Sequence, residues 1–221
     1  MNEPTTFKLL LVGASGRVGS HVLDLALSDP RVGKVYAPTR KTLAAHPKLI
    51  ATRIDFDHLD EQADRWQADA VICTLGTTLK TAGSRAAFER VDHTYPLAVA
   101  RLARAHGTPT YVLNSAIGAD AGSSFFYNQV KGRLEQDLAR VGFESLTYVR
   151  PGVIGGKREE VRHAERALIR MLKLASPLLP ERWRLNPPAL IARALLEAAI
   201  SQEPGIHVVP SSSMTKPADR N

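Results

Sequence analysis

The sequence of 221 residues predicts an α/β fold, a doubly wound parallel sheet with a small C-terminal helical cap. Three observations predict it. The apolar runs at residues 7–12 and 70–75 lack polar alternation, which is typical of parallel strands buried on both faces. Segments of helical periodicity separate such runs. A glycine-rich segment, residues 13–19, joins the first run to the first helix.

The expected elements alternate along the chain. Asp29-Pro30 ends the first helix and Gly142 ends the third. Within the second helix, Pro96 marks a kink or the start of a second half, with Thr94 as its cap. Ligands of such a sheet bind at the carboxyl ends of its strands. We expect strands at residues 7–12, 34–37, 49–54, 70–75, 110–114, 146–150 and 206–209, and helices at 19–28, 86–105 and 126–140.

We interpret residues 1–221 as one domain, because no segment has the composition of a linker. Residues 156–200 interrupt the alternation with two helical stretches, at 158–175 and 188–200, around a proline-rich segment. We expect them to form a substrate-side cap before the last strand. Residues 211–221 are expected to form a loose tail.

Composition limits the function classes. No apolar run reaches the roughly 18 residues of a membrane span, and we expect neither an integral membrane segment nor a signal peptide. The single cysteine, Cys73, fits a reducing cytoplasm and, at the end of an apolar strand, is interpreted as a small buried hydrophobe. The net charge is +7, but the basic residues are scattered, so we expect no nucleic-acid partner. No histidine pair has metal-ligand spacing, so we expect no metal.

The glycine segment is suited to a dinucleotide. Gly13 permits a sharp turn, Gly16 permits the backbone to approach a pyrophosphate, and Gly19 permits close packing of helix on strand. The helix N-terminus then offers free N–H groups to the phosphates. Following a buried strand and opening a helix, the segment predicts a nicotinamide dinucleotide site.

The residues after the second strand indicate which dinucleotide binds. An NAD site usually has an acidic residue there, whereas this chain has Arg40 and Lys41. Arg40 can bind a 2′-phosphate with two N–H groups, and Lys41 or Arg17 can add charge, so we predict NADP(H) over NAD(H). Asp55 either accepts from an adenine amino group or forms a turn.

A proton-transfer group follows further along the chain. Tyr127 and Lys131 are four residues apart, so a helix places them on one face. A nearby ammonium stabilises a phenolate, and the same ammonium can bind the cofactor ribose. Ser115, at the carboxyl end of a strand, can polarise a substrate carbonyl. We therefore predict Ser115, Tyr127 and Lys131 as catalytic residues.

Taken together, these motifs resemble an atypical short-chain dehydrogenase/reductase of the NAD(P)-binding Rossmann family. The chain is most similar to the Tat-interacting protein subgroup, which is related to the NAD(P)-dependent epimerase/dehydratase superfamily. The resemblance covers residues 8–209, through GASGRVG (13–19), IDFD (54–57), CTLGTT (73–78), YNQVKGRLE (127–135) and VRPGVI (149–154). It implies that the cofactor is held by Gly13, Ser15, Gly16, Arg17, Gly19, Arg40, Asp55, Thr74, Leu75, Gly76, Lys131, Pro151, Gly152 and Val153.

There are two departures from that family. Many members carry an asparagine where this chain reads Val91-Asp92-His93, and the turn after the fourth strand is Cys-Thr-Leu-Gly. The leading hypothesis is an NADP(H)-dependent oxidoreductase that acts on a small carbonyl or alcohol in the cytoplasm. The alternative is an NADPH-binding regulator or sensor with little turnover. A sugar-nucleotide epimerase or dehydratase is a third reading, disfavoured by the short chain. A homodimer or a protein partner is left open.

Overall fold

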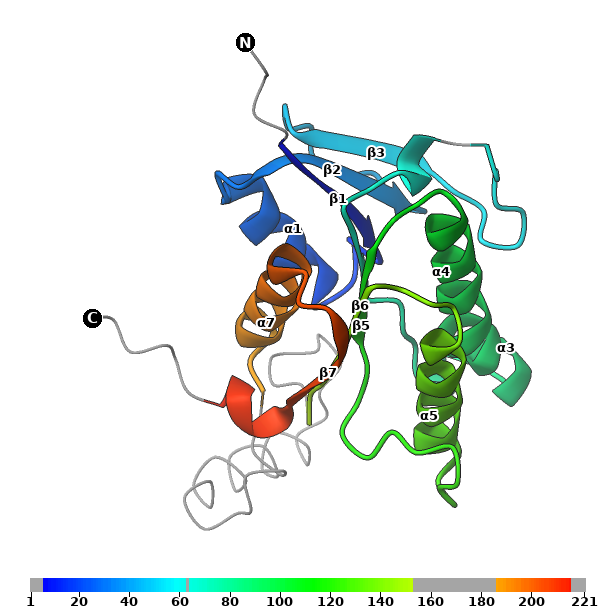
Figure 1. The fold of residues 1–221 in the computed structure, drawn as a ribbon. Helices are drawn as coiled ribbons and strands as arrows, with labels where there is room; N and C mark the ends of the chain where they lie inside the picture. The colour runs from blue at the N-terminus through cyan, green and yellow to red at the C-terminus, as the bar shows by residue number, and fades with distance from the viewer. Residues whose placement is uncertain (1–5, 63, 153–185, 216–221) are drawn as a thin grey trace, which may run out of the picture.

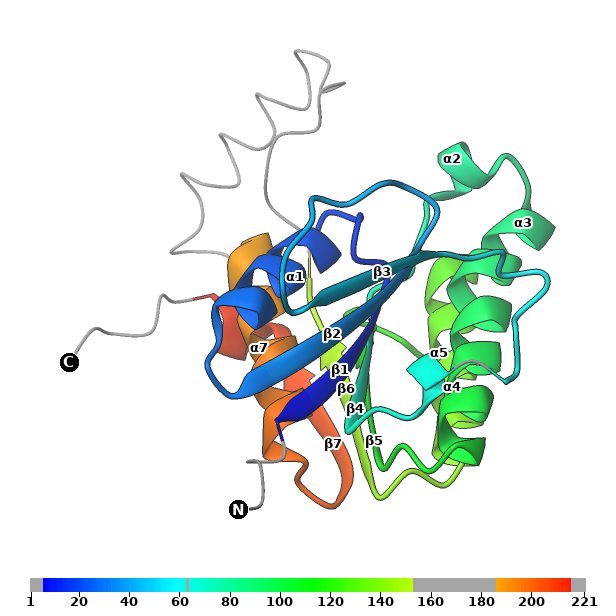
Figure 2. The same ribbon diagram turned by 90° about the horizontal axis from the view of Figure 1, so that it is seen from above.

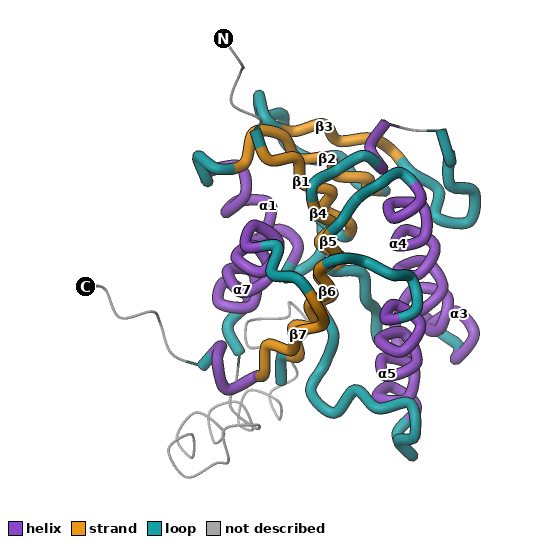
Figure 3. Tube along the Cα trace, in the orientation of Figure 1, coloured by secondary structure: helices purple, strands orange, loops and turns teal. Residues whose placement is uncertain are grey.

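The computed structural model describes residues 6–62, 64–152 and 186–215. Seven parallel strands form one sheet in the order β3-β2-β1-β4-β5-β6-β7, with helices on both faces (Figures 1 and 3). The predicted doubly wound sheet is confirmed. The strands are β1 (Phe7–Val12), β2 (Val32–Thr39), β3 (Leu49–Arg53), β4 (Ala70–Cys73), β5 (Thr110–Asn114), β6 (Ser145–Arg150) and β7 (Gly205–Pro210).

Two layers of helices enclose the sheet. One layer contains α1 (Gly19–Ser28) and α7 (Pro188–Ser201), and the other contains α3 (Arg85–Glu89), α4 (Tyr95–Ala105) and α5 (Phe126–Ala139) (Figures 1 and 2). The short helix α2 (Leu79–Ala82) precedes α3. None of the helices in the described ranges is long and apolar enough to cross a membrane.

The apolar runs form strands because both faces of the sheet are covered. In β1, Leu9 and Leu11 belong to the core beneath α1 and α7, whereas Leu10 and Val12 belong to the core beneath α4 and α5. All four side chains are inaccessible to solvent. A polar residue at any of these positions would be buried without a partner, which explains why the run has no polar alternation.

The strand order reverses between β1 and β4. The chain runs outward from β1 through β2 to β3, then returns to the other side of β1 and continues from β4 to β7 (Figure 2). In an open parallel sheet, such a reversal separates the loops at the carboxyl ends of the two strands and opens a crevice between them. The segments after Val12 and Cys73 therefore flank the expected ligand position.

The helical stretch predicted over residues 86–105 forms, and the expected start of a second half at Pro96 is confirmed, but the two halves are joined by a π-helical turn that was not expected. The chain forms α3, then a π-helical turn over Arg90–Thr94, then α4. Pro96 lies in the first turn of α4, where its missing N–H costs nothing, but the Thr94 side chain makes no capping bond. The wider π turn changes which side chains face the sheet, and it buries Asp92.

The described C-terminal segments also differ from expectation. The helix predicted at 188–200 forms as α7, but it packs beside α1 in the sheet core through Ile191 and Leu195 rather than over a substrate site. Ser211–Met214 forms a 3₁₀ turn with Met214 buried, so these residues are not a loose tail. Residues 153–185, which include most of the expected cap, lie outside the described residues.

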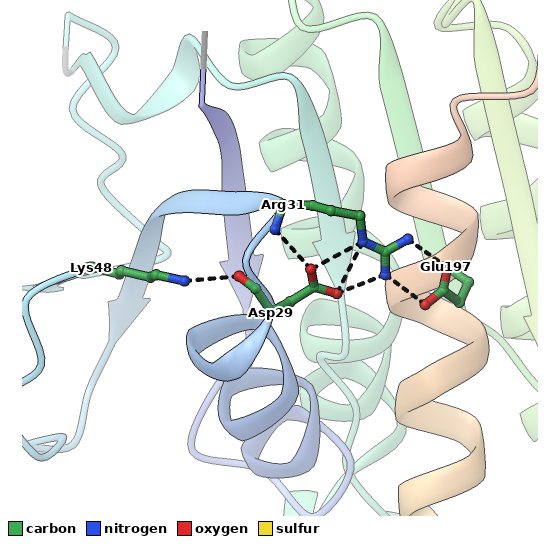
Figure 4. Close-up of polar contacts among 4 residues, drawn as sticks. All are labelled: Asp29, Arg31, Lys48 and Glu197. Atoms are coloured by element: carbon green, nitrogen blue, oxygen red, sulfur yellow. Dashed lines mark hydrogen bonds and ion pairs between the residues drawn. The ribbon is translucent and has the colours of Figure 1, made fainter. Parts of the chain in front are cut away.

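A cluster of charges joins four elements away from the carboxyl ends of the strands. Arg31, just before β2, binds Asp29 at the end of α1 and Glu197 on α7 at 2.6 and 2.8 Å. Lys48 donates to the Asp29 carbonyl at 2.8 Å (Figure 4). Hydrogen bonding from Arg31 lowers the pKa of Asp29. Since Lys48 directly precedes β3, we interpret this cluster as a structural tie between α1, β2, β3 and α7.

Cys73 is expected to resist alkylation in the folded protein. The thiol is fully buried at the end of β4, and burial raises its pKa, so little thiolate forms near neutral pH. With N-ethylmaleimide at pH 7.5, we expect labelling only after unfolding in urea, measured by intact mass. Rapid labelling of the folded protein would contradict the buried assignment.

Candidate active site

The glycine turn after β1 is built by close backbone approach. Gly13 has φ of +89°, a left-handed conformation that favours glycine. The Gly16 N–H donates to the Gly13 carbonyl at 2.9 Å, which closes the turn. Thr74 joins the turn to the end of β4, since its hydroxyl lies 3.0 and 3.1 Å from the carbonyl oxygens of Val12 and Gly13.

The glycine turn leads closely into the exposed N-terminal end of α1. A Cβ at Gly19 would lie 2.1 Å from the Gly13 carbonyl, so the helix can approach the turn only with glycine there. Ser15, Gly16 and Arg17 are exposed at the N-terminal end of α1. A bare backbone that leads into a helix N-terminus is the arrangement that binds a pyrophosphate.

Gly19→Ala is expected to destabilise the fold. The new methyl group would overlap backbone on one side and the Thr74 hydroxyl, 2.6 Å away, on another. Overpacking of this kind costs about 1–3 kcal/mol, measured by urea unfolding. Gly122→Ala is the matched control, because a Cβ there meets nothing closer than 3.5 Å and should change stability little. Equal stabilities of the two variants would contradict the packing described.

The two residues expected near the adenosine part differ in their surroundings. Arg40 is exposed directly after β2, and Thr39 beside it accepts the Lys41 N–H at 3.1 Å. Asp55 instead forms a turn: its carboxylate accepts the Asp57 N–H at 3.0 Å and lies 3.0 Å from the His58 ring. The hydrogen bond from His58 lowers the pKa of Asp55. Of the two alternatives for Asp55, the structure shows the turn.

Tyr127 and Lys131 occupy the first two turns of α5. The Tyr127 side chain is 41% exposed, and its ring packs against the buried Phe88 with centroids 5.8 Å apart. Lys131 is 3% exposed. The helix therefore presents a partly exposed tyrosine one turn from a buried lysine, as the four-residue spacing predicts.

Asp92 from the π-helical turn completes this group. Its Oδ1 lies 2.9 Å from Lys131 Nζ, and its Oδ2 accepts the Thr77 N–H at 2.8 Å. A Cβ at Gly76 would lie 3.4 Å from Asp92 Oδ1 and 4.0 Å from Lys131 Nζ. The segment from Thr74 to Thr77 thus connects the glycine turn to the ion pair.

Burial and charge act in opposite directions on Lys131. Burial lowers its pKa, whereas the Asp92 carboxylate raises it, and the net shift is upward. Lys131 is therefore protonated at neutral pH even though almost none of it reaches solvent.

Ser115 is held in a different network from the one expected. Its hydroxyl donates to Glu135 at 2.5 Å, and Glu135 is paired with Arg150, whose Nε lies 3.0 Å from the carboxylate. Ser115 is 3% exposed. The described residues show no hydrogen bond between Ser115 and either Tyr127 or Lys131, so the hydroxyl proton is committed to Glu135 in this state.

The segment after β6 closes the far side of the site. The Pro151 carbonyl accepts the Ile117 N–H at 2.8 Å. The Gly152 N–H donates to the buried Asn186 at 2.6 Å, and Asn186 in turn donates to the Ser211 carbonyl. Val153 lies outside the described residues. At the end of β5, Asn114 Oδ1 is buried with no hydrogen-bond partner in the described part of the chain.

Sequence reasoning missed three buried polar residues, Asp92, Glu135 and Asn186. Glu135 follows Lys131 by four residues, so helical spacing could have placed it on the same face as Tyr127. Asp92 was considered only as a missing asparagine, although a carboxylate there is a natural partner for a buried lysine. No sequence signal marks Asn186, which is found only through the contacts of residues distant in sequence.

A family model for the NAD dependent epimerase/dehydratase family matches residues 9–130, from the first strand into α5. The chain belongs to this family. The stretch contains the glycine turn, Asp92, Ser115 and Tyr127. Family membership makes the protein oxidoreductase-like, with a nicotinamide dinucleotide as a small-molecule ligand.

Curated relatives extend the similarity beyond that stretch. Protein HTATIP2 of Rattus norvegicus is 35% identical over 205 residues, which cover 89% of this chain and 83% of the rat protein. This match confirms the resemblance to the Tat-interacting protein subgroup. Protein fmp52, mitochondrial, of Aspergillus fumigatus is 35% identical over 202 residues, 86% of each chain. Six further fungal relatives from the same comparison also have names that describe them as mitochondrial. The expectation of a cytoplasmic location is therefore wrong, because these relatives are named as mitochondrial proteins.

Solved structures agree in fold at low identity. MoeE5 in complex with UDP-glucose and NAD has a TM-score of 0.70 at 17% identity, and covers 91% of this chain and 74% of MoeE5. The enzyme WbmH of Bordetella bronchiseptica, in complex with NAD+, has a TM-score of 0.67 at 17% identity, covering 93% of this chain and 76% of WbmH. The oxidoreductase ylbE of Lactococcus lactis has a TM-score of 0.65 at 17% identity, covering 93% of this chain and 94% of ylbE.

Proposed function

We propose that the protein is an NADP(H)-dependent oxidoreductase of the short-chain dehydrogenase/reductase type, acting on a small carbonyl or alcohol. One observation carries the proposal. Lys131, one turn from Tyr127 on α5, lies beside the segment from Thr74 to Thr77, and Thr74 binds the glycine turn. The dinucleotide, when bound, exchanges a hydride with the substrate. Gly13, Ser15, Gly16, Arg17 and Gly19 would hold its pyrophosphate, and Thr74, Leu75, Gly76, Pro151, Gly152 and Val153 would line the rest of the site.

The residues of the chain would handle the proton. Tyr127 is accessible and would donate its hydroxyl proton to the carbonyl oxygen during reduction, or accept one during oxidation. Lys131 would stabilise the phenolate that this transfer leaves, and would bind the ribose. Ser115 would orient the substrate. Since its proton points to Glu135, Ser115 offers the substrate its lone pairs, which suits a substrate hydroxyl better than a carbonyl.

Cofactor choice is proposed from Arg40. The guanidinium is exposed directly after β2, where an NAD site usually has an acidic residue and this chain has Thr39, Arg40 and Lys41. Arg40 would bind the 2′-phosphate of NADP(H).

Arg40→Ala is expected to weaken NADPH by about ten- to hundredfold, the value of one or two hydrogen bonds to a charged group. NADH affinity should change little, because NADH has no 2′-phosphate. Titration of nicotinamide fluorescence measures both. Arg140→Ala, at an exposed arginine paired with Asp137, is the control. Equal loss for NADPH and NADH would contradict the role given to Arg40.

A second candidate is a dinucleotide-binding regulator that signals to a protein partner or a second copy of itself. The buried Ser115–Glu135 bond favours it, because that bond withholds the hydroxyl proton from a substrate carbonyl. A panel of aldehydes and ketones with NADPH, together with alcohols with NADP, separates the two candidates. Turnover on any member supports the oxidoreductase. NADPH binding with no turnover over the panel supports the regulator.

A further inference from the structure

Asp92 lies in an unusual stretch of helix. Between α3 and α4, residues Arg90–Thr94 form a π-helical turn, and such turns are rare and frequently lie at functional sites. The turn places Asp92 in the interior, at 1% exposure. A carboxylate is costly to bury unless it is paired, so Asp92 depends on its polar contacts.

The carboxylate bridges two parts of the candidate site. One oxygen accepts the Thr77 N–H from the segment after β4, and the other lies 2.9 Å from Lys131 Nζ on α5. The approach to Lys131 is a charge contact without the angles of a directed hydrogen bond. Asp92 therefore fixes where the ammonium sits relative to the segment that contains Gly76.

In the described part of the chain, few ionisable groups act on the protonation of Lys131. The ionisable groups that act on it are the Asp92 carboxylate, the Tyr127 phenol one turn away on α5 and the Cys73 thiol on β4. The thiol is neutral near pH 7, because burial raises its pKa. Burial alone opposes the charged form of lysine. Among these groups, the Asp92 carboxylate contributes most to keeping the buried lysine charged.

We propose that Asp92 is a positioning residue that keeps Lys131 protonated and in place beside Tyr127. The inference rests on the proposed function, in which Lys131 stabilises the Tyr127 phenolate. It also answers the departure seen in the sequence: where many family members carry an asparagine, this chain supplies a charged partner that contacts the lysine directly.

The test follows the charge of Lys131 rather than turnover. In protein labelled with ¹³C at lysine Cε, the Lys131 signal is assigned by its loss in Lys131→Met and followed from pH 6 to pH 11. In the parent we expect no deprotonation below about pH 10.5, because the Lys131 pKa is raised above its ordinary value. A parent midpoint below pH 9 would overturn the proposal without any variant.

Asp92→Asn removes the charge at nearly constant volume. We expect the Lys131 midpoint to fall by one pH unit or more, on the order of the shift that a close opposite charge produces. Asp92→Glu keeps the charge and should restore much of the parent behaviour. The matched control is Asp137→Asn. Asp137 lies on the same helix as Lys131 but is paired with His93 and Arg140, so this variant should leave the Lys131 midpoint unchanged. An unchanged Lys131 midpoint in Asp92→Asn would overturn the proposal.

The pH dependence of turnover is the second measurement. Where a substrate is turned over, the loss of activity at high pH should move to lower pH in Asp92→Asn by the same amount as the Lys131 signal. A movement of the Lys131 signal with no turnover in the parent would leave Asp92 as the residue that holds the lysine and would count against the proposed oxidoreductase alone.

Discussion

Tyr127→Phe is expected to lower turnover by about 10²- to 10⁴-fold, the usual contribution of a positioned acid or base. The substitution removes one hydroxyl and leaves the ring, whose contact with Phe88 holds its orientation. Stability and dinucleotide affinity should stay close to the parent, because Tyr127 is partly exposed and its ring is kept. Steady-state kinetics and titration with NADPH measure the two effects separately.

Tyr95→Phe is the matched control for that experiment. It removes a tyrosine hydroxyl that binds Asp57 at 2.8 Å near the surface, away from Lys131. Its turnover should match the parent. If Tyr127→Phe also kept parent turnover, the proton would have to come from another group, and the assignment of the candidate site would be wrong.

Lys131→Met is expected to destabilise the fold by about 3–5 kcal/mol, since it leaves the Asp92 carboxylate buried without its partner. The double variant Asp92→Asn/Lys131→Met should recover most of that loss, because it removes both charges. Arg140→Met, which breaks the exposed pair with Asp137, should cost at most about 1 kcal/mol. Urea unfolding of the four proteins gives these free energies.

The same pair has a predictable pH dependence. The pKa of Lys131 is raised in the folded protein, so its contribution is complete below the unfolded pKa, about 10.4. The contribution falls as pH rises through the higher folded value. The difference between parent and Lys131→Met should therefore be constant from pH 7 to 9 and shrink above about pH 10.5. A difference that already shrinks at pH 8 would contradict the raised pKa.

Local patterns determined how much of the fold could be predicted. A short apolar run such as Leu9 to Val12, followed at once by glycines, indicates a strand covered on both sides, and three glycines before a helical period mark a turn that needs close approach. Tyr127 and Lys131 share a face because helical spacing fixes it. These features depend on residues close in sequence, and the structure places them as expected.

The remainder depends on contacts between residues distant in sequence. The π-helical turn that buries Asp92 has no local signature, since Arg90–Thr94 reads as ordinary helix. The bond from Ser115 to Glu135 spans 20 residues, and it redirects a hydroxyl whose position at the end of β5 was predicted. Helix α7 was expected in a cap because its pattern shows an apolar face without showing which surface that face covers.

Isothermal titration of the parent protein with NADPH, NADP, NADH and NAD tests the central claim most directly. The account predicts one site per chain, with the phosphorylated pair bound more tightly than NADH and NAD. Tighter binding of NADH and NAD would keep the site and overturn the role of Arg40. No binding of any of the four would contradict the claim that the glycine turn holds a nicotinamide dinucleotide.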